Sequence, residues 1–209
     1  MNTSSSSGPQ VPLRAARDQA LSVDSDSTVE LVLIRHPAVS IASGICYGRS
    51  NVSLEAPLEA SIEAVLAQWA ASGVARPARL YSSPLDRCAL VAARLAEQWA
   101  VPLELDADLI ELDFGAWELR RWDEIGRPAL DAWAADLEHA RPHGGESAAA
   151  VADRAQRWLA RACTDAPRVI VAVTHAGVIR MLASRLLGEP VGEGLRRPLE
   201  FGGICRFVR

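Results

Sequence analysis

Two of the four histidines in the 209-residue chain stand directly after short runs of branched apolar residues. His36 follows the run 29–34 with Arg35 beside it, and His175 follows the run 169–173 after one threonine. A guanidinium beside a histidine supplies a permanent cation and a bidentate donor, which suits a phosphoryl oxygen better than a protein core. Gly177 then opens a predicted helix whose first N–H groups would point toward a bound anion. The pattern indicates one anion site that both histidines meet.

Other roles for these histidines stay open at this point. A single histidine is more often structural than functional, because histidines also occur in cores and at surfaces. The pair could bind a metal ion, but that would need a third ligand and carboxylate support, and Arg35 opposes a cation. The other two histidines, His139 and His143, lie in a loop-like stretch and are expected at the surface or in a lid.

One more arginine and two acids are candidates for the same site. Arg87 lies near the start of a predicted helix, where its guanidinium could reach the anion, although a solvated helix charge is an equal alternative. Glu111 and Asp113 lie among aromatic residues in the stretch 109–118, and one of them could donate a proton. A solvated acidic turn explains each acid at least as well.

Strand and helix patterns alternate along the chain and must position these residues. The two histidine runs have the composition of strands buried on both faces of a sheet, and 78–81 is a weaker strand candidate that ends at Ser82. Helical spacing occupies the segments between them, 57–69, 84–99, 146–162 and 177–187. The alternation predicts an α/β fold with a mainly parallel central sheet, helices on both faces, and ligands beyond the carboxyl ends of the strands. Residues 203–208 are expected to form an edge strand.

The chain length favours a single catalytic domain over residues 28–209. Residues 106–143 fit neither pattern, combine aromatic and charged residues, and are expected to form a helical or loop lid insertion. The segment 1–27 is rich in serine and broken by charges, so it is expected to be a flexible N-terminal extension without the apolar run of a secretory signal.

Composition and charge argue against several partners. The formal net charge of −4 gives no general attraction to nucleic acid or to an anionic membrane. No continuous apolar stretch approaches the roughly 18 to 20 residues that a membrane helix needs. The four cysteines have no CxxC pair or metal-type spacing and are expected to be reduced. We expect a cytoplasmic protein with a small-molecule ligand, and the oligomeric state stays open.

Taken in order, the motifs resemble those of the histidine phosphatase superfamily, also called the phosphoglycerate mutase-like family, from about residue 31 to residue 187. The family's opening Arg-His-Gly is matched by Arg35-His36-Pro37, and its Ser-x-Leu-x-Arg element by residues 83–87. The acid element corresponds to 111–118, a Pro-x-Gly-Glu-Ser element to 142–147, and the second histidine motif to 174–180.

The resemblance implies a role for each of these residues. His36 would attack phosphorus in line and form a phosphohistidine, Arg35 and Arg87 would hold the phosphoryl oxygens, and His175 would stabilise the transferring group. Glu111 would protonate the leaving oxygen, and water would then release phosphate. The implied ligand is a small-molecule phosphomonoester, and the scheme requires no metal or organic cofactor.

The segment 44–54 contains Cys46-Tyr-Gly-Arg49 and is similar to the corresponding stretch of α-ribazole phosphatases, which act late in cobalamin biosynthesis. Some positions depart from the family pattern: Pro37 replaces a glycine and removes an N–H, and Val39 and Ala42 replace the Thr and Asn that contact phosphate in many relatives. Ser40, Ser43 or Arg49 could compensate, and Ser43 and Arg49 are candidates for binding substrate. The remaining departures are Leu119 in place of a glycine, and Cys88 and Leu90 in place of Gln and Thr.

Two other functions remain as alternatives. One is a broad-range sugar or phosphoglycerate phosphatase, or a mutase, although a mutase would be expected to carry longer insertions to enclose a bisphosphate. The other is a catalytically silent relative that binds a phosphorylated ligand, which only the departures around His36 support.

Overall fold

The computed structural model describes residues 29–164 and 168–208, so the extension expected over 1–27 lies outside the described residues. The main elements are β1 (Glu30–Arg35), α1 (Leu58–Ser72), β2 (Leu80–Ser82), α2 (Asp86–Trp99), β3 (Leu103–Leu105), α3 (Arg127–Ala135), α4 (Ala148–Ala162), β4 (Val169–Thr174), α5 (Ala176–Leu187), α6 (Val191–Leu195) and β5 (Ile204–Val208). Three single-turn 3-10 helices lie between β3 and α3.

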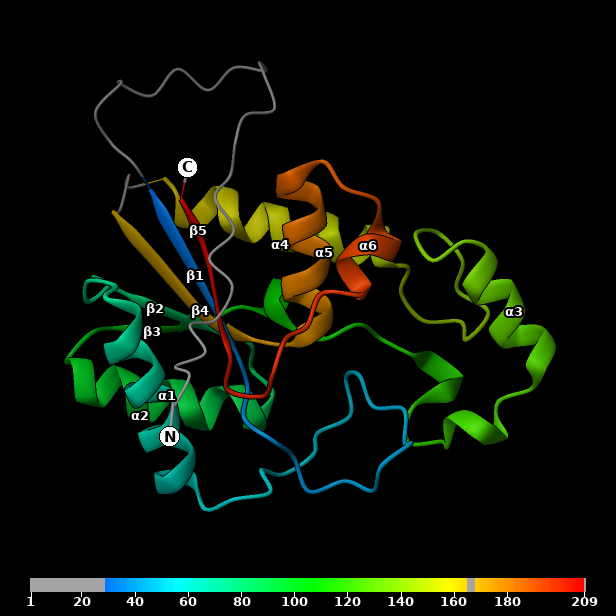
Figure 1. The fold of residues 1–209 in the computed structure, drawn as a ribbon, viewed down its shortest axis with the longest axis horizontal. Helices are drawn as coiled ribbons and strands as arrows, with labels where there is room; N and C mark the ends of the chain where they lie inside the picture. Colours follow the sequence, from blue (N-terminus) through cyan, green and yellow to red (C-terminus); the bar gives the residue numbers. More distant parts are fainter. Residues whose placement is uncertain (1–28, 165–167, 209) are drawn as a thin grey trace, which may run out of the picture.

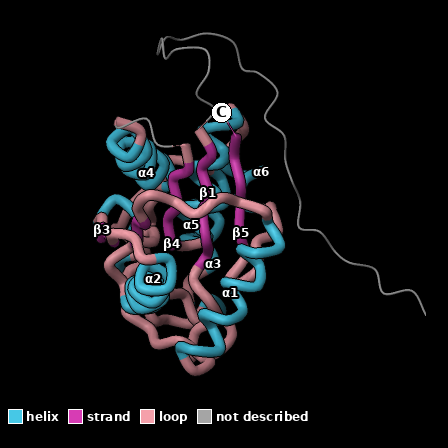
Figure 2. The backbone as a smooth tube through the Cα atoms, turned by 90° about the vertical axis from the view of Figure 1, so that its left-hand side faces the viewer, coloured by secondary structure: helices cyan, strands magenta, loops and turns pink. Residues whose placement is uncertain are grey.

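The five strands form one sheet in the order β3-β2-β4-β1-β5. The first four strands of that order pair in parallel, and β5 pairs antiparallel with β1 at the edge. Figure 2 shows β4, β1 and β5 side by side. The predicted α/β fold with a mainly parallel sheet is therefore confirmed, including the edge strand near the C-terminus. The short strand β3 was not predicted, because three residues after a proline carry no periodic signal.

Successive residues of β1 enter different hydrophobic cores, as strand geometry requires. Leu31 and Leu33 pack with α4 and α5, whereas Val32 and Ile34 pack with α1 and α2. In Figure 1 these two pairs of helices lie on opposite sides of the sheet. Because both faces are covered, the central residues of β1 and β4, 31–34 and 169–173, can all be apolar, which is the pattern that the sequence showed.

The carboxyl ends of β1, β2 and β4 meet at one edge of the sheet. The backbone N–H of His36 donates to Thr174 O at 2.9 Å, and the N–H of Ser83 donates to Val173 O at 3.0 Å. These bonds extend the sheet by one residue beyond β1 and β2. The polar residues that follow all three strands are thus held against one another by backbone pairing.

The insertion expected over 106–143 contains the 3-10 turns and one unpredicted helix, α3, which lies away from the sheet in Figure 1. Of the two histidines expected at the surface or in the lid, His139 lies at the surface, whereas His143 lies at the end of the insertion and is only 2% exposed. The ring of His143 contacts those of Phe114 and Trp117 at centroid distances of 5.6 and 5.0 Å. The aromatic residues of the insertion pack on one another, and the ring of His143 is buried within that cluster.

Leu119, at a position where the family usually has glycine, adopts a left-handed backbone conformation with φ of 61°. This conformation costs a non-glycine residue about 1 to 2 kcal/mol, partly offset by the lower chain entropy of leucine in the unfolded state. The Leu119 side chain is exposed, so its removal loses little packing. We expect Leu119→Gly to raise the free energy of unfolding by about 0.5 to 1 kcal/mol and the Tm by roughly 2 °C.

The matched control for this prediction is Leu90→Gly, a similarly exposed leucine within α2. There glycine should lower the free energy of unfolding by about 1 kcal/mol, because its backbone is helical. Thermal unfolding followed by circular dichroism measures both variants. A Tm of Leu119→Gly below that of wild type would contradict the inference of backbone strain at Leu119.

Candidate active site

His36 is buried at the end of β1, and its ring has a defined orientation. The ring atom Nδ1 lies 2.7 Å from Pro37 O, which can only accept, so Nδ1 is the protonated nitrogen and Nε2 carries the lone pair. Burial and the nearby cations Arg87 and Arg35 lower the pKa of His36 to about 3. The imidazole is therefore neutral at physiological pH, with a nucleophilic Nε2 beside two guanidinium groups.

His175 lies next to His36 at the end of β4, with the ring centroids 5.2 Å apart. The residue is fully buried, and its Nε2 shares a hydrogen bond with Ser83 Oγ at 2.8 Å. Burial, followed by the charges of Arg87 and neighbouring groups, lowers the pKa of His175 well below its usual range. The structure thus brings together two neutral histidines from two strands.

Arg35 and Arg87 lie beside these rings and are anchored by backbone carbonyls. Arg35 donates to Leu199 O at 2.6 Å, and its guanidinium carbon lies 3.6 Å from the centroid of the Phe201 ring. Arg87, which is fully buried, donates to Gly48 O at 2.6 Å and to Ser50 O at 2.8 Å.

Each of these two guanidinium groups also keeps a free donor. The Nε atoms of Arg35 and Arg87 are both buried, and neither has a hydrogen-bond partner in the described part of the chain. A buried N–H group without a partner is costly, and an anion beside the histidines would satisfy it. No carboxylate forms an ion pair with either guanidinium within the described ranges 29–164 and 168–208.

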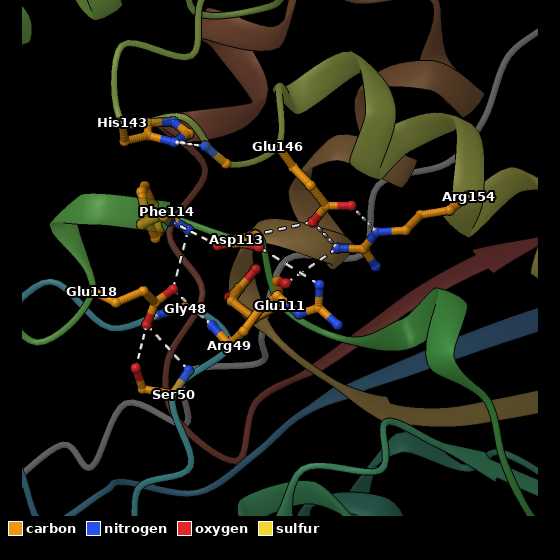
Figure 3. Close-up of polar contacts among 12 residues, drawn as sticks. Gly48, Arg49, Ser50, Glu111, Asp113, Phe114, Glu118, His143, Glu146 and Arg154 are labelled. Carbon is orange, nitrogen blue, oxygen red and sulfur yellow. Dashed lines mark hydrogen bonds and ion pairs between the residues drawn. The ribbon is translucent and has the colours of Figure 1, made fainter.

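Glu111 reaches the same place from the insertion. Its carboxylate accepts a hydrogen bond from the N–H of Gly177 at 3.1 Å, at the start of α5 and two residues after His175. A Cβ added at Gly177 would lie 2.2 Å from Glu111 Oε1, so a larger residue there would displace this carboxylate. Buried Arg154 holds the acid loop by donating to Glu111 O at 3.2 Å and to Glu146, as Figure 3 shows.

The other candidates from the sequence have different surroundings. Asp113 accepts from the N–H of Gly115 at 2.7 Å and lies 3.6 Å from Arg49 in an ion pair. Arg49 is half-exposed, and Ser43 lies in an exposed turn. Between the two acids, the structure therefore places Glu111 at the start of α5, two residues beyond His175, and uses Asp113 within its own turn. Within the described residues, neither Arg49 nor Ser43 forms a hydrogen bond or an ion pair with His36 or His175.

Sequence reasoning missed several residues around the histidines. Ser83 bonds to His175, Phe201 stacks on Arg35, and the ring centroid of Tyr47 lies 5.5 Å from the Arg87 guanidinium carbon. Ser83 and Tyr47 lie inside recognisable motifs and could have been found there. Phe201 lies in a turn between α6 and β5, and no local pattern distinguishes it.

The buried histidines also predict how stability depends on pH. Folded His36 takes up a proton near pH 3, whereas an unfolded histidine does so near 6.5, so stability is complete above 6.5 and is lost as pH falls toward 3. Between pH 7.5 and 5, His36 should lower the free energy of unfolding by about 2 kcal/mol, and His175 acts in the same direction. Urea unfolding of wild type and His36→Gln at both pH values measures this loss. An equal loss in the two proteins would contradict the prediction.

Two further surveys cover only the described residues. No three His, Cys, Asp or Glu side chains in 29–164 and 168–208 come together in a way that could hold a metal ion. None of the helices in the same ranges is both long enough and apolar enough to cross a membrane.

The fold is that of an α/β protein with a cluster of histidines and arginines at the carboxyl ends of its parallel strands. The chain belongs to the histidine phosphatase superfamily (branch 1), whose family model matches residues 31–209. This confirms the resemblance that the ordered motifs indicated.

The named relatives include two kinds of phosphatase. The chain is 31% identical over 112 residues to the adenosylcobalamin/α-ribazole phosphatase of Escherichia coli strain K12, a match that covers 52% of this chain and 55% of that protein. It is 30% identical over 172 residues to the glucosyl-3-phosphoglycerate phosphatase of Mycolicibacterium vanbaalenii, covering 77% and 75%. The solved α-ribazole phosphatase of Shigella flexneri is similar with a TM-score of 0.72 and 26% identity, over 86% of this chain and 93% of that one. The first of these matches spans only about half the length of the curated relative.

Proposed function

We propose that the protein hydrolyses phosphomonoesters through a phosphohistidine on His36. The observation that carries the proposal is the neutral His36 ring, with Nδ1 bonded to Pro37 O, beside two arginines that each keep a buried donor without a partner in the described chain. An imidazole oriented in this way can attack phosphorus through Nε2, and the guanidinium groups meet the charge that develops on the phosphoryl oxygens.

The reaction would proceed in two displacements. In the first, the N–P bond to His36 forms as the P–O ester bond breaks, and Glu111 gives its proton to the leaving oxygen. In the second, water attacks phosphorus, Glu111 takes a proton from that water, and the N–P bond breaks. Arg35, Arg87 and His175 would hold the transferring group in both steps.

We infer α-ribazole 5'-phosphate as the leading substrate. Support comes from the similarity to named α-ribazole phosphatases and from the position of the Cys46-Tyr-Gly-Arg49 segment. Within that segment, Tyr47 lies beside Arg87, and Gly48 supplies a carbonyl that Arg87 binds. The motif that distinguishes this subgroup would therefore form part of the substrate's surroundings.

A second candidate substrate is glucosyl-3-phosphoglycerate. The relative with this name matches over three quarters of its own length, a larger share than the α-ribazole phosphatase of Escherichia coli. A broad-range phosphatase, a phosphoglycerate mutase and a silent phospho-ligand-binding protein remain as further outcomes of the same test.

The test is phosphate release from four compounds without added metal: α-ribazole 5'-phosphate, glucosyl-3-phosphoglycerate, 3-phosphoglycerate and p-nitrophenyl phosphate. The first should have the highest kcat/KM. A preference for the second would support the alternative substrate, and similar values for all four would indicate a broad-range enzyme. Isomerisation of 3-phosphoglycerate without phosphate release would support a mutase. Phosphate binding without turnover of any compound would overturn the proposal in favour of a silent relative.

Glu111→Gln tests the proton donor by its dependence on the leaving group. A sugar alkoxide must be protonated as it leaves, whereas p-nitrophenolate leaves without a proton. We expect Glu111→Gln to lower kcat/KM for α-ribazole 5'-phosphate by about 10²-fold or more, and that for p-nitrophenyl phosphate by less than about tenfold. Asp113→Asn should show no such difference between the two substrates. The reverse result would make Asp113 the proton donor.

A further inference from the structure

Glu118 accepts an unusual number of hydrogen bonds at the side of the site. Figure 3 shows its carboxylate facing the loop of Gly48, Arg49 and Ser50. The backbone N–H groups of these three residues donate to it at 3.0, 2.9 and 3.1 Å, and the Ser50 hydroxyl donates as well. Three successive N–H groups that converge on one anion form a backbone nest, which is a strong anion-binding arrangement.

The loop is shaped for this carboxylate. A Cβ added at Gly48 would lie 1.9 Å from Leu112 O and 2.6 Å from Glu118 Oε1. Only glycine allows the loop to lie so close to the acid element. Burial raises the pKa of Glu118, but the hydrogen bonds from Ser50 and from the backbone outweigh that effect and bring the pKa below its ordinary value. The side chain is therefore an anion at neutral pH.

The opposite side of the same loop holds Arg87. While the N–H groups of Gly48 and Ser50 point to Glu118, their carbonyls accept from the two terminal nitrogens of Arg87. The two carbonyls set the plane of the guanidinium, and its Nε keeps no partner among the described residues. The direction of that free donor is consequently fixed by the loop, and the loop is fixed by Glu118.

Glu118 also connects this loop to the acid element. Its Oε1 accepts from the N–H of Phe114 at 3.1 Å, within the same segment that carries Glu111. One carboxylate thus ties together the backbone under Arg87 and the backbone that leads to Glu111. Either segment could shift alone if the carboxylate were lost.

We propose that Glu118 is a positioning residue, which sets the Arg87 guanidinium and the acid loop for phosphoryl binding through the Gly48–Ser50 nest. It touches neither histidine, and it acts on the substrate only through Arg87 and the loop. The inference rests on the proposed function in assigning phosphate to Arg87.

A simple electrostatic role predicts the opposite sign. A negative charge near an anion site repels phosphate, so removal of that charge alone would tighten phosphate binding. If Glu118 instead positions Arg87, its removal weakens phosphate binding, although the site becomes more positive. The direction of the change separates the two roles.

The experiment measures inorganic phosphate binding by calorimetry and turnover of p-nitrophenyl phosphate, for wild type, Glu118→Gln, Arg87→Ala and the double variant. We expect Glu118→Gln to weaken phosphate binding by about tenfold or more and to lower kcat/KM by about 10²-fold. In the Arg87→Ala background, Glu118→Gln should change phosphate affinity by less than about threefold, because Arg87, through which it acts on phosphate affinity, is gone. Glu124→Gln, an exposed acid six residues away, is the charge-matched control and should change neither quantity.

Several results would overturn the proposal: tighter or unchanged phosphate binding in Glu118→Gln, or losses that multiply in the double variant. If Glu118→Gln does not fold, Ser50→Ala removes a single bond to the carboxylate and should give a smaller loss with the same non-additivity. The binding cycle does not depend on catalysis. If wild type turns over no substrate but the binding pattern holds, the proposed function fails while the role of Glu118 stands.

Discussion

Replacement of His36 by alanine should lower the rate of phosphate release by at least about 10³-fold, the largest effect that we expect of any single substitution. The imidazole is a neutral nucleophile whose orientation is fixed beside both arginines, because its Nδ1 is committed to Pro37 O at 2.7 Å. Without it, water would have to attack the ester directly. Steady-state release from the preferred substrate measures the effect.

Binding and trapping separate a lost nucleophile from a damaged site. His36→Ala should still bind inorganic phosphate, because Arg35 and Arg87 remain. Wild type quenched during turnover of a phosphate-labelled substrate should carry acid-labile, alkali-stable label, as a phosphohistidine does, and the variant should carry none. His139→Ala, at an exposed histidine, is the control. More than a tenth of wild-type turnover in His36→Ala would rule out the phosphohistidine route.

Arg87→Lys should lower kcat/KM by about 10²-fold, and Arg87→Ala by about 10³-fold. Lysine keeps the charge, but one ammonium cannot bond Gly48 O and Ser50 O while also presenting a donor in the direction of the Arg87 Nε. Both phosphate affinity and kcat should decrease, because the Arg87 guanidinium binds the transferring phosphoryl group in the ground state and in the transition state.

Arg94→Lys is the matched control for this prediction, since Arg94 lies two turns further along α2 and is half-exposed. It should keep kcat/KM within about twofold. Kinetics on α-ribazole 5'-phosphate and p-nitrophenyl phosphate, with circular dichroism to check folding, measure all three variants. If Arg87→Lys retains kcat/KM within threefold, catalysis does not depend on the planar geometry of the Arg87 guanidinium.

Most of the fold could be predicted from local sequence patterns. The strands β1 and β4 contain continuous apolar runs that end at a charged or polar residue, so their position and their burial on both faces followed from composition. The helices α1, α2, α4 and α5 followed from their spacing. The helix α3 was missed because it has only nine residues within a stretch of mixed aromatic and charged residues. Its Leu130 and Trp133 are only partly buried, against the aromatic cluster of the insertion and not against the sheet.

By itself the sequence determined the family, the fold class and a short set of chemically capable residues. His36, Arg35, Arg87, His175 and Glu111 could all be selected because their motifs are local. Tertiary structure decided how these residues are used: which nitrogen of His36 is free, that Glu111 and not Asp113 binds the N–H of Gly177 at the start of α5, and that Arg49 pairs with Asp113. It also revealed that Glu118, 70 residues away from Gly48, holds the loop on which Arg87 rests. Such relations depend on directions and distances between segments far apart in the chain, and only the packing of both helical layers on one sheet fixes them.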